Sequence, residues 1–262
     1  MKREDYPFLY ETHMHTSESS KCANNTGAEM ARACRDAGYA GIIITDHSWY
    51  GNCRIDRNLP WREWVEEFCR GYENARRWGD ENDFSVFFGF ESCYRGPEFL
   101  IYGVDKDWLM THPQIRDASI EEQYELVHGA GGMVIQAHPF RKEDYIEVFR
   151  QYPEWVDGLE GINATHSCHL SSHHKCADWD RQAVELARAK KLPITAGSDV
   201  HSTLIFGGGV AFKRRLTSAA DYCAAILGGE DYILTDGDTW YDKNGQPLGK
   251  GADKGGTAWE IK

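Results

Sequence analysis

The stretch Glu11-Thr12-His13-Met14-His15-Thr16 directly follows a short apolar run near the start of the chain. Alternate side chains of a β-strand share one face, so His13 and His15 are expected to present two imidazoles to the same side, about 7 Å apart. A second pair at this spacing, Asp199 and His201, follows another apolar segment. Two such pairs, far apart in the sequence, indicate a metal site assembled by the fold.

Four other strand-like runs also lead to side chains that bind metals in proteins. The carboxyl ends of parallel strands lie at one edge of a sheet, and in a β/α barrel that edge carries the active site. The runs are 41–45, followed by Asp46 and His47; 84–90, followed by Glu91; 133–137, followed by His138; and 156–162, which contains Glu160 and precedes Asn163. This recurrence favours one shared site over unrelated polar residues at strand ends.

Helices are predicted between several of these runs. Thr26-x-x-Glu29 and Ser119-x-x-Glu122 each match a capping box, which marks the start of a helix. A further helix is predicted to start near Pro60. Its apolar residues at helical spacing are Trp61, Trp64, Phe68, Tyr72 and Ala75. An aromatic stripe of this kind is typical of core packing, so Trp61 and Trp64 are assigned to the core.

The pattern gives about seven strands, joined mostly by helices, although no helix fits between 84–90 and 99–104. Nearly continuous apolar strands are typical of parallel sheets covered on both faces. A barrel brings the ends of the first and seventh strands into one cluster, whereas an open doubly wound sheet would spread them along a line. The predicted fold class is therefore α/β, with a barrel architecture.

Composition limits the classes of function. The 262 residues, 41% hydrophobic and 13% aromatic, fit a globular protein of one barrel or two domains. No apolar run approaches the roughly 20 residues that span a bilayer, and the polar start lacks a signal-peptide core, so a cytoplasmic protein without a membrane partner is predicted. None of the eight cysteines forms a Cys-x-x-Cys pair, and most are expected to be reduced and structural. The net charge of −12 makes nucleic acid an unlikely partner, because a broad phosphate-tracking surface needs positive charge.

The strand-end residues supply more ligands than one metal ion needs. They are His13, His15, His47, Glu91, His138, Asp199 and His201. One ion takes three or four protein ligands, so this set suggests two or three ions that share a bridging carboxylate. Imidazole-rich ligation suits zinc, iron or manganese better than calcium. We therefore expect two or three divalent transition metal ions as cofactors.

Taken in order, these segments resemble the PHP (polymerase and histidinol phosphatase) superfamily of metal-dependent phosphoesterases. The matching pieces are Glu11-Thr12-His13-Met14-His15-Thr16, Ile44-Thr45-Asp46-His47, Gly89-Phe90-Glu91, Gln136-Ala137-His138-Pro139, Leu159-Glu160-Gly161-Ile162-Asn163 and Gly197-Ser198-Asp199-Val200-His201. The resemblance implies a distorted (β/α)₇ barrel, TIM-like and of the PHP type, with a di- or trinuclear metal site. It also implies how the ligands divide: His13, His15, Glu91 and Asp199 on the first ion, His47 and His201 on the second, and His138, with Glu91 bridging, on the third.

The chain departs from the family pattern at two positions. Members often carry an Asp or His a few residues after the His-x-His, where this chain has Glu18 within Ser17-Glu18-Ser19-Ser20-Lys21-Cys22. Many also have a His on the strand after the bridging Glu, where this chain has Glu98. Glu18 and Glu98 are the candidate replacements at these positions, and Asp46 is expected to orient a neighbouring ligand rather than bind metal.

The resemblance implies hydrolysis of a small phosphomonoester, as in histidinol phosphatase, by attack of a metal-bound hydroxide. Glu91, Asp199 and His201 would form the catalytic centre. Arg141 is expected to bind the phosphoryl oxygens of a small phosphorylated substrate, a surface ion pair being its alternative role. Arg95 is a weaker candidate for this role, and His166 is a candidate for substrate contact.

Two other functions stay open from the sequence. PHP domains attached to DNA polymerases suggest a phosphodiesterase or nuclease, although the sequence shows no basic groove. The second is a PHP domain that binds metal without catalysis, which the changed positions Glu18 and Glu98 keep open.

The sequence is predicted to form a single PHP domain over 1–262, with a motif-bearing core at 8–201 and a C-terminal extension at 210–262. A turn is expected at Gly207-Gly208-Gly209, just before the extension. Within the extension we expect a helix at 218–227, a short strand at 232–234 and a hairpin turn at Asn244-Gly245. The last stretch, rich in Gly and Lys, is expected at the surface or partly disordered.

Overall fold

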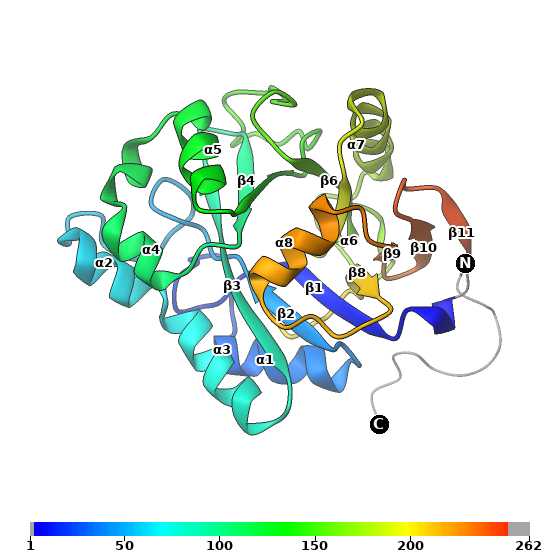
Figure 1. Cartoon of the computed structure of the whole chain (residues 1–262), viewed down its shortest axis with the longest axis horizontal. Helices are drawn as coiled ribbons and strands as arrows, with labels where there is room; N and C mark the ends of the chain where they lie inside the picture. Colours follow the sequence, from blue (N-terminus) through cyan, green and yellow to red (C-terminus); the bar gives the residue numbers. More distant parts are fainter. Residues whose placement is uncertain (1–2, 251–262) are drawn as a thin grey trace.

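The computed structural model describes residues 3–250, whose strands form one mixed sheet with helices around it (Figure 1). The strands are β1 Phe8–Met14, β2 Gly41–Ile44, β3 Ser85–Cys93, β4 Glu98–Tyr102, β5 Met133–Ala137, β6 Gly158–Asn163, β7 Ile194–Gly197, β8 Gly208–Phe212, β9 Tyr232–Asp236, β10 Thr239–Asp242 and β11 Pro247–Lys250. The helices are α1 Gly27–Asp36, α2 Trp61–Phe68, α3 Arg70–Glu81, α4 Lys106–Thr111, α5 Ile120–Gly129, α6 Ala164–Ser167, α7 Ala177–Lys190 and α8 Ala219–Leu227, with 3₁₀ turns at Arg3–Asp5 and Pro113–Asp117.

Strands β1 to β7 lie side by side in chain order, as the barrel prediction required. β1, β2 and β3 are parallel, and so are β5, β6 and β7, but β4 runs antiparallel to both its neighbours. The turn between β3 and β4 is closed by the Tyr94 N–H, which donates to the Pro97 carbonyl at 2.8 Å. So short a connection can only join antiparallel strands. The α/β class is confirmed, whereas a regular count of seven β/α units is not.

The sheet curls until the carboxyl end of β7 reaches the carboxyl end of β1. Thr12 Oγ1 donates to the Ala196 carbonyl at 2.7 Å, and the His15 N–H donates to the Val200 carbonyl at 3.0 Å. Toward its amino end, β1 pairs instead with the antiparallel strand β8. The sheet is therefore a curled, partly closed barrel, and the first and seventh strands meet at the edge that carries the polar residues.

The predicted helix starts are confirmed at both capping boxes. Thr26 caps α1 and Ser119 caps α5, each with its glutamate returning a hydrogen bond to the cap backbone. The helix expected from Pro60 is instead two helices, α2 and α3, because the backbone of Cys69 (ψ −2°) interrupts it. The apolar stripe continues across this break, so its periodicity could not reveal the interruption.

The segments after β7 extend the sheet with antiparallel strands β8 to β11. The predicted helix, strand and hairpin are present as α8, β9 and the β10–β11 turn at Asn244-Gly245. The turn expected at Gly207-Gly208-Gly209 is wrong, because Gly208 and Gly209 begin β8. A Cβ on Gly209 would lie 2.2 Å from the Tyr10 carbonyl oxygen, so glycine is needed for this close strand pairing. Residues 251–262, including the Gly- and Lys-rich end, lie outside the described residues.

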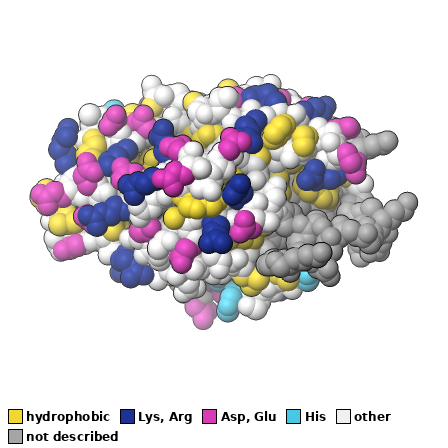
Figure 2. Space-filling view, turned by 90° about the horizontal axis from the view of Figure 1, so that it is seen from below, with side chains coloured by type: hydrophobic (Ala, Val, Ile, Leu, Met, Phe, Trp, Pro, Cys, Tyr) yellow, Lys and Arg dark blue, Asp and Glu magenta, His cyan; other side chains and the backbone are white. Residues whose placement is uncertain are grey.

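Basic and acidic side chains alternate on the surface shown in Figure 2, where Lys and Arg form no continuous stripe among the described residues. This face therefore lacks the unbroken positive track that binding to a nucleic acid backbone requires.

None of the described helices is long and apolar enough to cross a bilayer.

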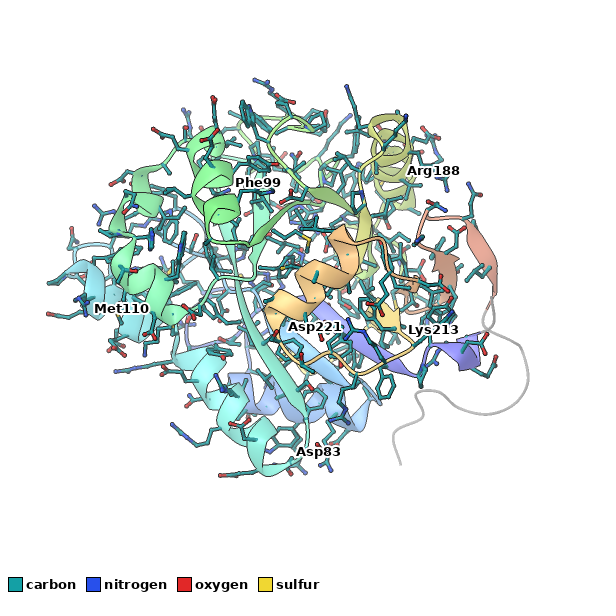
Figure 3. All side chains as sticks on the ribbon, in the orientation of Figure 1. Asp83, Phe99, Met110, Arg188, Lys213 and Asp221 are labelled. Atoms are coloured by element: carbon teal, nitrogen blue, oxygen red, sulfur yellow. The ribbon has the colours of Figure 1, made fainter. Side chains whose placement is uncertain are left out.

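Packed side chains fill the space between the sheet and the helices, with Phe99 of β4 among them (Figure 3). Phe99 packs edge-on against Tyr94. At the amino ends of the parallel strands, Tyr222 of α8 contacts Tyr102 and Phe212. The aromatic stripe of α2 also packs in the core, as predicted, with its two tryptophan rings stacked 5.4 Å apart. One end of the barrel is thus filled, and the opposite end holds the polar cluster.

Candidate metal centre

The predicted ligands converge at the carboxyl edge of the parallel strands. The structure brings together His13 and His15 from β1, His47 after β2, Glu91 from β3, His138 after β5, and Asp199 and His201 after β7. Side chains of the first six are at most 11% exposed, whereas that of His201 is 28% exposed. The cluster is therefore buried on most sides and opens to solvent at His201.

The Glu91 carboxylate is the hub of this cluster. Its Oε1 atom lies 3.3 Å from Nε2 of His13 and 3.3 Å from Nε2 of His138. Its Oε2 atom lies 2.8 Å from Nδ1 of His47 and 3.6 Å from Nε2 of His15. Each oxygen thus faces a different pair of imidazoles, which is the geometry of a carboxylate that bridges two metal ions.

Several overlapping sets of three side chains could each hold an ion, with ligand atoms within 4.8 Å of one another. These sets are His15, His47 and His201; His13, Glu91 and His138; His13, His15 and Asp199; and His47, Glu91 and Glu98. The sets share members, so ions bound in them would lie close together. A multinuclear centre fits this arrangement better than separate sites.

The donor atoms at the centre of the cluster make no hydrogen bonds among the described residues. His13 Nε2, His47 Nδ1 and both oxygens of Glu91 are buried without a hydrogen-bond partner. Buried polar atoms are nearly always paired, and an unpaired one is costly. These atoms are lone-pair donors that point at one another, and divalent cations would satisfy all of them. The residues present therefore fit a metal centre.

Glu160, which the sequence placed on a strand of the site but to which it assigned no role, orients two of the ligands. Its Oε1 atom lies 2.8 Å from His13 Nδ1, and its Oε2 accepts from the His138 N–H at 3.0 Å and from Asn163 Nδ2 at 2.9 Å. When Nδ1 of His13 donates to Glu160, the lone pair of Nε2 is directed toward Glu91. A carboxylate behind a histidine in this way fixes the ring and makes it a stronger ligand.

Asp46 has the orienting position expected for it. Its carboxylate accepts hydrogen bonds from the Thr16 N–H and hydroxyl at 2.6 Å each and from the Ser20 hydroxyl at 2.7 Å. Ser20 Oγ in turn lies 3.3 Å from His15 Nδ1. Burial raises the pKa of Asp46 to about 6. Asp46 thus fixes the loop after β1, and through Ser20 it helps to orient His15.

Two solved structures share this architecture, whereas no protein-family model and no curated protein matches the sequence. A two-domain protein from Bacteroides vulgatus, described as containing a predicted PHP-like metal-dependent phosphoesterase, superposes with a TM-score of 0.62 over 91% of this chain and 67% of that chain, at 14% identity. This chain has the PHP-type fold. A protein from Bifidobacterium adolescentis, proposed to be a metal-dependent phosphoesterase, superposes with a TM-score of 0.52 at 16% identity, over 84% of this chain and 95% of that chain. The recognition made from the ordered motifs is confirmed at the level of the fold.

The two positions at which the chain departs from the PHP pattern have different outcomes. Glu98 is brought to the cluster, where its Oε2 lies 3.5 Å from His138 Nε2. It begins the antiparallel strand β4, and the start of β4 lies beside the carboxyl ends of β3 and β5. Glu18 is not brought to the cluster. Its carboxylate accepts hydrogen bonds from the Gly27 N–H at the start of α1 and from Asn74. A carboxylate at a helix amino end is stabilised there by the helix dipole.

Arg141 lies beside this cluster, and not in the surface ion pair that was its alternative role. Its side chain is 4% exposed, and its Nη1 atom lies 2.7 Å from Asp199 Oδ2. Its Nη2 atom is buried without a hydrogen-bond partner among the described residues. Arg95, the weaker candidate, is 77% exposed and pairs with Glu147 on the surface. Of these two candidates, only Arg141 lies at the cluster.

The charges of the site are strongly coupled. Burial alone would raise the pKa of Glu91, but the surrounding histidines, with His13 foremost, hold that pKa well below its usual value. Burial alone would lower the pKa of His13, but Glu160, Asp199 and Glu91 raise it well above its usual value. Likewise burial alone would raise the pKa of Asp199, but Arg141 and the neighbouring histidines together keep that pKa well below its ordinary value. The carboxylates of Glu91 and Asp199 are therefore held in their charged form.

Backbone strain is stored at two of the ligands. His138 has a φ of 27° and Asp199 a φ of 54°, in the left-handed region that side chains other than glycine rarely adopt. Each follows directly or closely on a strand, where a sharp change of direction aims the side chain at the cluster. Such strain costs of order 1–3 kcal/mol per residue and is found mainly at functional sites.

Proposed function

We propose that this chain is a metal-dependent phosphoesterase that hydrolyses a small phosphomonoester, a reaction of the histidinol phosphatase type. The observation that carries the proposal is the position of the Glu91 carboxylate among four imidazoles. The Nε2 atom of one of them, His13, lies close to both Glu91 and Asp199. Asp199 in turn pairs with the buried Arg141. A cation-binding cluster beside a buried guanidinium is suited to an anionic substrate that needs charge neutralisation on two sides.

The residues that would hold two or three zinc, iron or manganese ions are His13, His15, His47, Glu91, His138, Asp199 and His201, with Glu98 as an additional ligand. When bound, such ions supply Lewis-acid charge and make a water molecule acidic enough to serve as the nucleophile. His201 donates its Nδ1–H to the Asp199 carbonyl at 2.9 Å, which leaves its Nε2 free as a ligand. Because His201 is the most exposed ligand, the substrate would enter from its side.

Arg141 has the position of the substrate-binding group in this proposal. Its guanidinium is fixed by Asp199, and its Nη2 atom is left to bind a phosphoryl oxygen. A terminal phosphoryl group carries up to two negative charges, which the cluster and one arginine can surround. A nucleic acid diester instead needs a longer basic track, and the net charge of −12 opposes its binding. A monoesterase is therefore preferred to the nuclease alternative, and the nearly complete ligand set speaks against a purely binding role.

The experiment that tests this function compares metal-reconstituted variants on phosphomonoesters and phosphodiesters. Arg141→Ala should reduce kcat/KM on monoesters by about tenfold or more, equal to at least roughly 1.4 kcal/mol of transition-state stabilisation, with metal content unchanged. Arg95→Ala, which removes an exposed arginine, is the matched control and should behave like wild type. Efficient cleavage of long single-stranded DNA, with Arg141→Ala unchanged on monoesters, would overturn the proposal and favour the nuclease alternative.

A further inference from the structure

The guanidinium of Arg141 is held on two of its edges and free on the third. Nη1 lies 2.7 Å from Asp199 Oδ2, and Nε donates to Nε2 of His166 at 3.1 Å. Nη2 is buried and has no hydrogen-bond partner among the described residues. Tyr145 also has a side-chain hydrogen-bond interaction with this guanidinium, but Nη2 itself has no partner in hydrogen-bonding geometry among the described residues. The direction of the free edge is therefore set by the groups on the other two.

His166 is itself held in one orientation and one tautomer. Its Nδ1 atom lies 2.6 Å from Oδ1 of Asp180, and the ring of Trp179 packs edge-on against the imidazole at 5.1 Å. The Arg141 Nε–H can only donate, so His166 Nε2 must accept and its proton must be on Nδ1, facing Asp180. Arg141, His166 and Asp180 therefore form one connected series of hydrogen bonds, in which each donor meets an acceptor.

Asp180 anchors the series to the scaffold. It lies in the first turn of α7, where its Oδ1 also accepts from the Asn163 N–H at the end of β6, at 3.3 Å. His166 belongs to the short helix α6 between these two elements and is 2% exposed. A histidine that only filled space would not need buried partners matched at both ring nitrogens, since burying polar groups is costly unless each is paired.

We propose that Asp180 and His166 are positioning residues that hold Arg141 with its Nη2 edge presented to the phosphoryl oxygens of the substrate. The inference rests on the proposed function only in taking the anion to be a phosphoryl group. Neither residue touches the substrate; both act through Arg141. A guanidinium fixed in advance loses less conformational freedom on binding, and this raises affinity for a small anion without any new contact.

The test measures binding of inorganic phosphate to the metal-reconstituted protein by calorimetry, without turnover. His166→Phe removes the acceptor for Arg141 and should weaken phosphate binding by about tenfold, the loss typical of a hydrogen bond to a charged group. His166→Gln keeps an acceptor and a donor and should recover affinity to within about threefold of wild type. His169→Phe changes a histidine of the same segment that pairs with Asp238 at the surface, and it should bind phosphate like wild type.

A double-mutant comparison separates positioning from packing. If His166 acts through Arg141, His166→Phe should cause no further loss in the Arg141→Ala background. Asp180→Asn, which keeps the side-chain shape, is the milder variant if His166→Phe folds poorly, and it should weaken phosphate binding by about threefold. Three results would each overturn the proposal. The first is that His166→Phe reduces phosphate affinity equally in the wild-type and Arg141→Ala backgrounds. The others are an unchanged affinity in His166→Phe or Asp180→Asn, and a wild-type protein that binds no phosphate. Phosphate binding with these effects but without monoester hydrolysis would instead reject only the proposed function.

Discussion

Among single residues, Glu91 is the one on which the site depends most. It is fully buried, it faces four imidazoles, and neither of its oxygens has a hydrogen-bond partner among the described residues. A buried carboxylate needs positive charge around it, because a buried charge without a partner costs several kcal/mol. Its charge, more than its shape, is therefore what the site requires.

Glu91→Gln nearly preserves the shape and removes the charge. We expect metal occupancy and phosphatase activity to fall together by at least about 100-fold, more than the usual effect of losing a residue that only orients a ligand. Elemental analysis of the reconstituted protein and initial rates give both quantities. Glu18→Gln is the matched control, because the Glu18 carboxylate binds the start of α1, and it should keep its full metal content. Full metal and rate in Glu91→Gln would show that Glu91 is not the bridge.

The seven ligands could be predicted because each lies on or just after an apolar run, and the fold gathers strand ends. Glu160 also lies on such a run, but its role could not be assigned from that position, and Ser20 lies on none of the runs. Glu160 acts on His13, a residue 147 positions away in the chain, and Ser20 acts on His15 from an irregular loop. Glu18 was proposed as a metal ligand because it lies a few residues after the His-x-His, but its side chain turns toward α1. Contacts across the fold decide these cases, and spacing does not encode them.

Among the elements, the crossing of α1 and α3 supports the loop that carries Thr16. A Cβ on Gly27 would lie 2.0 Å from the Gly71 carbonyl oxygen, so these helices touch through their glycines. A Cβ on Gly71 would lie 2.0 Å from Thr16 Oγ1 and 3.1 Å from Asp46 Oδ2. The hydrogen bond between Thr16 and Asp46 therefore occupies space that a larger residue in α3 would need.

Gly71→Ala is expected to destabilise the protein although alanine favours helices over glycine by about 1 kcal/mol. The clash should lower the free energy of unfolding by about 1–3 kcal/mol, measured by denaturant titration. Gly129→Ala in α5 is the control, since a Cβ there meets nothing within 4 Å, and it should be neutral or stabilising. A Gly71→Ala variant as stable as the control would mean that the Thr16 loop adjusts freely.

Element starts were more predictable than element directions. The capping boxes at Thr26 and Ser119 placed α1 and α5 because their hydrogen bonds are local. The antiparallel direction of β4 and the break at Cys69 depend on a short turn and on one backbone torsion. Apolar periodicity is the same for a strand in either direction, so it revealed neither feature. The missing helix between 84–90 and 99–104 was the one sequence signal for the direction of β4, because a short connection joins antiparallel strands.

For the molecule as a whole, closure of the sheet creates the site. The contacts between β1 and β7 bring His13 and His15 beside Asp199 and His201, although the two pairs lie at opposite ends of the 11–201 segment. The barrel was favoured from the sequence for this reason, since an open sheet would separate these ends. The one-domain boundary over 1–262 and the small phosphorylated substrate stay predictions.

The most direct test of the central claim is a metal titration of chelator-treated protein, with phosphate release from a phosphomonoester as the readout. We predict that activity is absent without metal, rises with added zinc, manganese or iron, and levels off at about two to three equivalents, because the ligand sets overlap around one bridging carboxylate. Activity that survives chelation, or uptake of less than half an equivalent with no phosphate released, would contradict a multinuclear phosphoesterase.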